Sequence, residues 1–305
     1  MNYNVLLRKF STMVREPRTL LIKLLYLISP ILGDKAYLKL LFPLKVGYKL
    51  SLRAPKTYNE KLQWLKIYYR NPDLPMMVDK FEAKKYVGNL IGEEYIIPTL
   101  GVWDCFEDID LSSLPQQFVL KTTHDQGGVI ICKDRDRFDI ALAKKKITSH
   151  LKRNFGRYSK EWPYKMVRPR VILEEYMVDA KTGELKDYKF FCFNGEPKLF
   201  YIASNRQNKD EGLKFDYFDL NFNRLDIKQA YANSDKVLEK PKSFDKMLEF
   251  SKMLSRNLPH VRVDFYEINE RLFFGELTFF HHSGFVPFYP AEWDYKLGDY
   301  IKLPK

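Results

Sequence analysis

The pattern of apolar and polar residues predicts a chain in which helices and strands are mixed. Apolar residues at helical spacing predict helices over residues 56–69, 78–91, 141–154 and 243–258. Runs rich in β-branched and aromatic residues predict strands over 95–103, 118–123, 129–134, 170–178, 188–195 and 197–204. Strands and helices do not alternate strictly and no segment repeats, so we expect an α+β fold rather than a doubly wound sheet.

Residues 261–280, VRVDFYEINERLFFGELTFF, predict a β-hairpin with an acid on each strand. If the turn has an odd number of residues, for example 269–271, Asp264 pairs with Glu276 and Arg262 pairs with Thr278. Because strand side chains alternate with a period of two, all four then lie on one face. Facing like charges destabilise a sheet, so a positive group is expected between the two carboxylates.

The hairpin residues match the ligands that Mg²⁺ prefers. Carboxylates from adjacent strands together with a hydroxyl form a site of oxygen atoms only, and substrate phosphates can complete the octahedron. We therefore expect Asp264, Glu276 and Thr278 to hold a metal ion. The alternative is that Asp264 forms a salt bridge with Arg262 while Glu276 is exposed.

Two further stretches are compatible with a nucleotide site. In FVLKTTHDQGGVIICK (118–133), Lys121 lies in an apolar strand, and Gly127 and Gly128 would let backbone amides approach phosphate oxygens. A common hairpin turn with an edge lysine explains this stretch equally well. In VILEEYMV (171–178), backbone groups could bind an adenine edge while Tyr176 and Met177 pack on its faces. An edge strand is the favoured alternative there.

The composition narrows the class of partner. A chain of 305 residues is long enough for two or three packed subdomains, and its net charge of +12 indicates an anionic partner. Without a nucleic-acid-binding motif, we do not expect nucleic acid. Three isolated cysteines indicate a reducing compartment and argue against a disulfide scaffold or a zinc site. The adjacent residues His281 and His282 are expected on opposite faces of a strand, and the acids of 134–136 in a solvated turn.

The N-terminal stretch TLLIKLLYLISPIL (19–32) is apolar but interrupted by Lys23 and Pro30, so it is too short for a confident membrane span. A helix packed on the protein body is favoured. The alternative is a helix in the interface of an anionic inner leaflet, with Arg8, Lys9 and Arg15 close by. No cleavage signature follows, so a cytoplasmic location is expected, in the second case at the inner face of the membrane.

Taken in order, several pieces resemble the ATP-grasp superfamily: VDK with Lys80, FVLK…HDQGG, LEEYM, and RVDFY…GELTF. More narrowly, NEKLQWLK, GEEYIIPTLGVWD, LKDYKFFCFNGEPK, HVRVDFY and FGELTFF resemble the TupA-like ATP-grasp proteins, which are encoded among genes for surface polysaccharides and teichuronopeptide. The resemblance runs from about Leu50 to the end. It implies two α+β subdomains that grip ATP between antiparallel sheets, over 76–172 and 173–305, after a helical N-terminal region over 1–75.

The resemblance also implies roles for individual residues and the cofactors ATP and Mg²⁺. Lys121 and Arg262 would be catalytic, with Arg262 steadying the reacting acyl group. The other expected roles are Lys80 and Lys121 at the ATP phosphates, Gly127 and Gly128 in the loop over them, Glu174, Glu175 and Met177 at the adenine hinge, Asp187 near the ribose, Arg206 at a further phosphate contact, and Asp264, Glu276 and Thr278 on the metal.

The activity that the resemblance implies is that of an ATP-dependent carboxylate–amine ligase working through an acyl phosphate. The expected substrates are a uronic-acid carboxylate of a capsule or surface polysaccharide, or its precursor, and a small amine such as an amino acid or amino alcohol. Three alternatives stay open: a glycosyltransferase of the same pathway, an ATP-grasp kinase acting on a sugar hydroxyl, and a non-catalytic basic protein at a membrane. No Ser-His-Asp or Cys-His nucleophile is recognisable.

Overall fold

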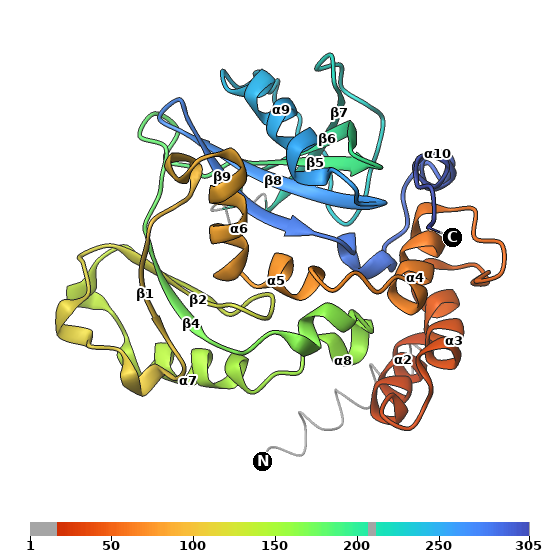
Figure 1. Ribbon diagram of the computed structural model, residues 1–305, viewed down its shortest axis with the longest axis horizontal. Coiled ribbons are helices and arrows are strands. Elements are labelled where there is room, and N and C mark those ends of the chain that lie inside the picture. The colour runs from red at the N-terminus through yellow and green to blue at the C-terminus, as the bar shows by residue number, and fades with distance from the viewer. Residues whose placement is uncertain (1–16, 207–211, 305) are drawn as a thin grey trace.

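Two antiparallel sheets form the centre of the protein. The computed structural model describes residues 17–206 and 212–304. The smaller sheet has the strand order β1-β4-β2-β3 and the larger sheet β7-β6-β5-β8-β9. The strands are β1 (Thr99–Trp103), β2 (Phe118–Thr122), β3 (Val129–Cys132), β4 (Val171–Glu175), β5 (Asp187–Phe193), β6 (Glu196–Ser204), β7 (Lys214–Asp219), β8 (His260–Ile268) and β9 (Arg271–Thr278). Figure 1 shows the larger sheet above the smaller one, and the predicted α+β class is confirmed.

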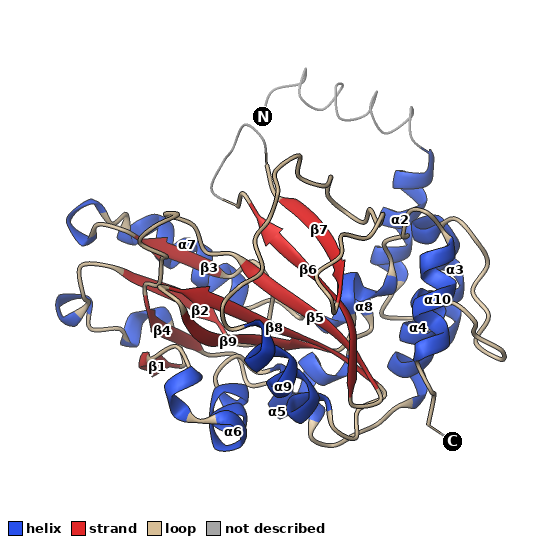
Figure 2. Ribbon diagram, turned by 90° about the horizontal axis from the view of Figure 1, so that it is seen from above, coloured by secondary structure: helices blue, strands red, loops and turns tan. Residues whose placement is uncertain are grey.

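Helices cover the outer faces of both sheets and gather at one end of the molecule. Their bounds are α2 (Pro17–Ile28), α3 (Asp34–Val46), α4 (Tyr58–Tyr68), α5 (Leu74–Val78), α6 (Glu82–Ile91), α7 (Ile140–Leu151), α8 (Gly156–Ser159), α9 (Phe244–Ser255) and α10 (Glu292–Tyr300). Figure 2 shows α2 and α3 next to α4 and α10 at this end. Within the described ranges, no helix is long and apolar enough to cross a membrane.

Each sheet buries one face under a helix. On the larger sheet, Phe190 and Phe200 stack with ring centroids 4.9 Å apart, and Phe244 of α9 packs against both rings. On the smaller sheet, Ala143 and Ile147 of α7 pack into a separate apolar cluster. Because strand side chains alternate, the residues next to these aromatic positions point away from α9. The polar residues of β5, β8 and β9 therefore share the opposite face of the larger sheet.

The hairpin of β8 and β9 has the predicted pairs, although its turn differs from the one we expected. The turn is the two-residue loop Asn269–Glu270, with both residues at positive φ, instead of the three-residue loop 269–271. A β-bulge at Gly275 adds one residue to β9, so that Asp264 still pairs with Glu276 and Arg262 with Thr278. The bulge compensates for the shorter turn and keeps all four side chains on one face.

The helix predicted over 78–91 is interrupted. α5 ends at Val78 and α6 begins at Glu82, so Lys80 lies in the turn between them. The backbone N–H of Lys80 donates to the carbonyl oxygen of Thr123 at 3.1 Å, which ties this turn to the end of β2. The predicted domain boundary at 172/173 falls inside β4, and the division into domains stays a prediction.

A tight contact between α4 and α10 fixes the helical end of the molecule. Thr57 begins α4 with a capping box, in which its hydroxyl accepts from the backbone N–H of Glu60. The Asp294 carboxylate of α10 accepts from the backbone N–H and the side-chain amide of Asn59, each at 2.9 Å. At Gly298 the two helices approach so closely that a Cβ atom would overlap the backbone of Lys56 and Thr57. Only glycine permits this approach without displacement.

Gly298→Ala is therefore expected to destabilise the protein by about 1–3 kcal/mol, because backbone atoms cannot move aside as a flexible side chain would. Thermal unfolding followed by circular dichroism measures the change. Gly33→Ala is the matched control: Gly33 has an ordinary φ of −59° and no heavy atom within 4 Å of a built Cβ. Equal melting temperatures for the two variants would contradict the proposed steric constraint.

Candidate functional site

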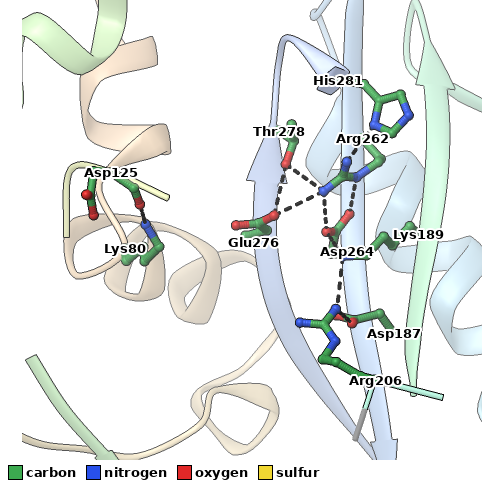
Figure 3. A network of polar contacts seen from close by, with 10 residues as sticks. All are labelled: Lys80, Asp125, Asp187, Lys189, Arg206, Arg262, Asp264, Glu276, Thr278 and His281. Carbon is green, nitrogen blue, oxygen red and sulfur yellow. Dashed lines mark hydrogen bonds and ion pairs between the residues drawn. The ribbon is translucent and has the colours of Figure 1, made fainter. Parts of the chain in front are cut away.

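The polar face of the larger sheet carries a row of charged side chains. Lys189 on β5 pairs in register with Asp264 on β8, which pairs with Glu276 on β9. Two pairs further along, Arg262 lies opposite Thr278. Figure 3 shows these side chains converging on one spot above the sheet. The convergence follows from strand pairing and the period of two, because residues in register on neighbouring strands lie on the same face.

The positive group between the two carboxylates is the guanidinium of Arg262. Its Nε and Nη2 donate to the two oxygens of Asp264 at 2.7 and 2.6 Å, and Nη2 also donates to Glu276 Oε1 at 3.0 Å. Thr278 Oγ1 accepts from the same Nη2 at 3.0 Å. The Arg262–Asp264 pair of our alternative interpretation is thus present. Glu276 joins it, although its side chain is 40% exposed.

Lys189 is a member of this cluster that the sequence analysis missed. Its ammonium forms an ion pair with Asp264 and lies 3.2 Å from Asp187 Oδ1. Asp187 is buried and also accepts from Arg206, so the expected ribose and phosphate residues lie next to each other. A lysine inside the fully buried strand DYKFFCF was the available signal, because a buried ammonium requires an acidic partner.

The cations of the cluster hold Glu276 in its ionised form. Burial raises the pKa of Glu276, but Lys189, Arg262 and Lys80 outweigh burial and lower the pKa to about 2. Burial disfavours the charged form of Arg262 too, yet Asp264 holds the pKa of this guanidinium well above its usual value. Glu276 and Arg262 therefore stay ionised across the physiological pH range.

His281 fixes the orientation of Arg262. Its Nδ1 accepts from Arg262 Nη1 at 2.7 Å, so Nε2 carries the proton and donates to Gln229 Oε1 at 2.8 Å. The hydroxyl of Tyr217 donates to the same Gln229 oxygen at 3.1 Å. Burial, followed by His282 and Arg262, holds the pKa of His281 well below its usual value, which keeps the imidazole neutral. These hydrogen bonds hold Nη1 of Arg262 at His281, so that Nη2 is directed at the two carboxylates.

The expected opposite orientation of His281 and His282 is wrong. The two residues do not lie in a strand but in a short 3₁₀ segment, η6 (His281–Gly284), in which His282 and Ser283 have positive φ. Their ring centroids are only 4.1 Å apart. The side-chain amide of Gln63 on α4 donates to the carbonyl oxygens of Ser283 and Gly284 and fixes the unusual backbone.

Lys80 faces the charged cluster from the other side. Its ammonium donates to the backbone carbonyl of Asp125, in the loop between β2 and β3 (Figure 3). Burial lowers the pKa of Lys80, and Glu276 is the strongest of the carboxylates that act in the opposite direction. Lys121, the other expected phosphate lysine, lowers the pKa of Lys80 further.

The loop 124–128 is folded around its own polar contacts. The Asp125 carboxylate accepts from the Thr122 hydroxyl and from Nδ1 of His150 on α7. A Cβ atom at Gly128 would overlap Thr122 Oγ1, and Gly127 has φ of +86°. Both glycines that we expected near phosphate are therefore required by the shape of the loop itself.

Glu174, on β4 of the smaller sheet, lies between Lys121 of β2 and Lys84 of α6. Its carboxylate forms ion pairs with Lys121 and, at 2.5 Å, with Lys84. Burial raises the pKa of Glu174, but the two lysines outweigh it and lower the pKa. Lys84 is another residue that sequence analysis missed, although it follows Lys80 by one helical turn in VDKFEAKKY. Both oxygens of the Glu174 carboxylate are thus in ion pairs with lysines.

The expected adenine hinge adjoins an apolar contact between the sheets. The exposed residue Glu175 donates its backbone N–H to Pro98 O at 3.2 Å. Met177 packs against a small cluster formed by Ile97, Ile268 and Phe273. An apolar surface next to cationic side chains is the combination that a nucleotide requires.

The donor set of the hairpin is suitable for Mg²⁺. Asp264, Glu276 and Thr278 supply only oxygen atoms, and one oxygen from each of the three already accepts from the same nitrogen of Arg262. Among the described residues, no three or more His, Cys, Asp or Glu side chains form a metal-binding group. The chain would therefore supply two carboxylates and a hydroxyl, and substrate oxygens and water would supply the other ligands. The acids expected in a solvated turn, Asp134 and Asp136, are exposed.

Comparisons with known proteins were made by sequence and by structure. A family model described as TupA-like ATPgrasp matches residues 60–302. A comparison with curated protein sequences gives no match.

Solved structures with partial similarity include two D-alanine–D-alanine ligases. The one from Helicobacter pylori has 16% identity and a TM-score of 0.43, over 80% of this chain and 69% of that chain. The one from Bacillus anthracis, complexed with ATP, has 16% identity and a TM-score of 0.38, over 67% and 55%. The ATP-grasp ligase PsnB, complexed with minimal precursor, Mg and ADP, has 9% identity and a TM-score of 0.39, over 72% and 57%. The chain thus spans little more than half of the last two proteins.

Lys189→Met is expected to raise the pKa of Glu276 from about 2 towards its ordinary value of 4.5, because Lys189 is the strongest of the cations that lower it. A depressed carboxylate pKa stabilises the fold above pH 4.5, and the stabilisation is lost as the pH falls towards 2. In the variant this stabilisation is smaller, and its loss is complete at a higher pH. NMR titration of ¹³C-labelled glutamate carboxyls measures the shift. Lys181→Met removes only an exposed ion pair with Glu270 and is the control. An unchanged Glu276 titration would contradict the assignment.

Proposed function

Since the chain belongs to the TupA-like ATP-grasp family, we propose that it is an ATP-dependent ligase that joins a carboxylate to an amine through an acyl phosphate. One observation carries the proposal: Arg262 lies between Asp264 and Glu276 on one sheet, and Lys80 lies on the side of this cluster to which Glu276 points (Figure 3). Phosphoryl transfer depends mainly on positioning and neutralisation of charge, and the cluster has the groups for both.

In the proposed nucleotide site, the phosphates of ATP contact Lys80 and Lys121, with the loop 124–128 above them. In the structure Lys121 forms an ion pair with Glu174. A phosphate bound at Lys121 would therefore either share this ammonium with Glu174 or take the place of Glu174. Arg206 provides a further cation beside Asp187. Adenine lies at Glu175 and Met177, where the apolar cluster between the sheets offers a surface for a flat ring.

Asp264, Glu276 and Thr278 would hold Mg²⁺, which when bound neutralises charge on the phosphates. Arg262 then binds the substrate carboxylate, and it stabilises the negative oxygen that develops when the amine attacks. His281 keeps this guanidinium oriented, and Lys189 continues to neutralise Asp264 and Asp187. These residues bind, orient and balance charge, so the chemistry requires no nucleophilic side chain.

The proposed reaction has two steps. A carboxylate oxygen attacks the γ-phosphorus of ATP, the bond to the β–γ bridging oxygen breaks, and ADP leaves. The amine nitrogen then attacks the acyl carbon, the bond to the phosphate oxygen breaks, and the nitrogen loses a proton as the amide forms. We propose a uronic-acid carboxylate of a surface polysaccharide or its precursor as the first substrate, because the net charge of +12 favours acidic sugars.

Release of ADP is expected only when a uronic acid and an amine are both present, and screening uronic acids against amines tests this double dependence. Hydroxylamine should trap a hydroxamate, because it reacts with an activated carboxylate. Asp264→Asn and Glu276→Gln should each lower turnover by about 100-fold or more. Glu276→Gln, at a side chain that is 40% exposed, should keep a melting temperature near that of the wild type. Asp264→Asn should melt at a lower temperature, because it leaves Arg262 and Lys189 without their buried carboxylate. Turnover with sugar but no hydroxamate would indicate a kinase, and turnover of a nucleotide sugar without ATP a glycosyltransferase.

We also propose that the N-terminal helices contact an anionic membrane surface. Leu25 of α2 is buried against α3, as expected for a packed helix. The other face of α2 exposes Leu20, Leu21, Leu24 and Leu27 by 49 to 75%, and Lys23 is exposed beside them. Exposed leucines flanked by cations match an interfacial helix on acidic lipid. The predicted contributions of Arg8, Lys9 and Arg15 lie outside the described residues.

Leu24→Glu/Leu27→Glu should reduce binding to vesicles that contain phosphatidylglycerol by about tenfold or more, because two leucines leave the acyl boundary and two negative charges are added. Co-sedimentation with these vesicles and with vesicles of phosphatidylcholine alone measures the effect. Leu90→Glu/Leu100→Glu changes the charge equally at leucines that are 41% and 50% exposed elsewhere. Wild-type protein that stays in the supernatant with the anionic vesicles would refute the membrane contact.

A further inference from the structure

A second candidate binding site lies between the N-terminal helices and the loop of Gly127 and Gly128. It is a cavity of about 730 Å³. Its walls come from five parts of the chain: α2 and α3 supply Tyr26 and Lys45, the loop 124–128 supplies Gln126, and residues 152–159 and 282–286 complete it. Apart from Gln126 of the loop 124–128, none of the residues proposed above to hold the nucleotide or the metal lines this cavity.

The charge of the cavity is strongly positive. Lys45, Lys152, Arg153 and Arg157 line it, and its lining includes no aspartate or glutamate. His282 contributes no charge at neutral pH, because burial, with Arg262 and Lys189 nearby, lowers its pKa to about 4. A concave surface of one sign concentrates ligands of the opposite sign, so the cavity favours an anion with several charges.

Aromatic rings lie beside these cations. Tyr26 and Tyr158 pack with ring centroids 4.9 Å apart, and Phe155 and Phe285 also line the cavity. Arg157 lies over the ring of Tyr158, at 5.4 Å from its centroid. Aromatic faces accept the apolar C–H surface of a sugar ring, while neighbouring cations and hydroxyls bind its polar substituents. A phosphate or carboxylate ion alone would not require these rings.

The inner end of the cavity lies close to two parts of the proposed active site, the surroundings of Arg262 and those of Lys80. The ring of His282 is 4.1 Å from the ring of His281, whose Nδ1 accepts from Arg262. Gln126 is next to Asp125, whose carbonyl oxygen accepts from Lys80. A ligand in the cavity is therefore separated from Arg262 and from Lys80 by one or two side-chain contacts. Lys66 donates to Ser283 O at 2.7 Å and helps hold this wall in place.

We propose that this cavity is the acceptor subsite and that it binds an acidic saccharide of at least two sugar units. This inference rests on the proposed ligase function. The reacting carboxylate would reach Arg262, while further acidic groups contact Lys152 and Arg157 at the exposed end. A single uronic acid carries one carboxylate and cannot reach Arg262 and the outer cations together. The cavity thus selects an oligomer over a monomer.

Calorimetric titration with galacturonic acid and with its linear trimer, in the presence of Mg²⁺ and ADP, tests the proposal. Wild-type protein should bind the trimer about tenfold more tightly or better, and added salt should reduce this preference. Lys152→Glu/Arg157→Glu should abolish the preference. Lys152→Arg/Arg157→Lys, which keeps both charges, should retain it. Arg168→Glu/Lys252→Glu is the matched control, because it makes the same charge change outside the cavity.

Equal affinity of the wild type for monomer and trimer would overturn the proposal, even if a charge-reversed variant failed to fold. Equal binding of a triglutamate peptide would overturn the saccharide assignment, because the peptide has the charges without the rings. The rise in melting temperature with Mg²⁺ and ATP separates the two proposals. If the rise occurs without a trimer preference, the subsite alone is refuted. If the wild type shows no rise, the ligase function is refuted.

Discussion

The guanidinium of Arg262 lies between two carboxylates that would otherwise repel each other on one sheet face. Asp264 is fully buried, and its charge is balanced by Arg262 on one side and Lys189 on the other. Removing one member of such a group leaves an uncompensated charge in a poorly solvated place, which costs far more than an exposed pair contributes. The cluster therefore constrains the strands that carry it and the histidine that orients it.

The orientation of Arg262 depends on parts of the chain that are distant in sequence. Arg262 contacts His281, which belongs to η6, and the unusual backbone of η6 is held by Gln63 and Lys66 of α4. α4 in turn is fixed by Asp294 of α10 through Asn59. The N-terminal and C-terminal helices thus support the charged cluster through direct contacts. A displacement of α4 would reach Arg262 through two intermediate contacts.

Polarity changes along the proposed binding surface in the order that the substrates require. An apolar cluster around Met177 lies at the junction of the sheets, the lysines and the hairpin acids follow, and the cavity with Arg157 and Tyr158 lies beyond them. A nucleotide has an apolar base and a charged tail, and an acidic saccharide has both ring faces and charges. The TupA-like ATP-grasp family, the proposed ligase chemistry and the acidic acceptor are consistent with this arrangement.

The sequence by itself determined the local features and the faces of the strands. Thr57 as the cap of α4 follows from short-range patterns, and the shared face of Asp264 and Glu276 follows from the strand period. The turn did not follow in this way: the pairing survives because the bulge at Gly275 offsets a two-residue loop. Only the tertiary structure identified Lys189, Lys84 and His281, because the partners that make these residues significant come from other strands and helices. Pairing across 75 residues, as between Lys189 and Asp264, depends on which strands become neighbours, and this depends on the burial of the whole aromatic sheet.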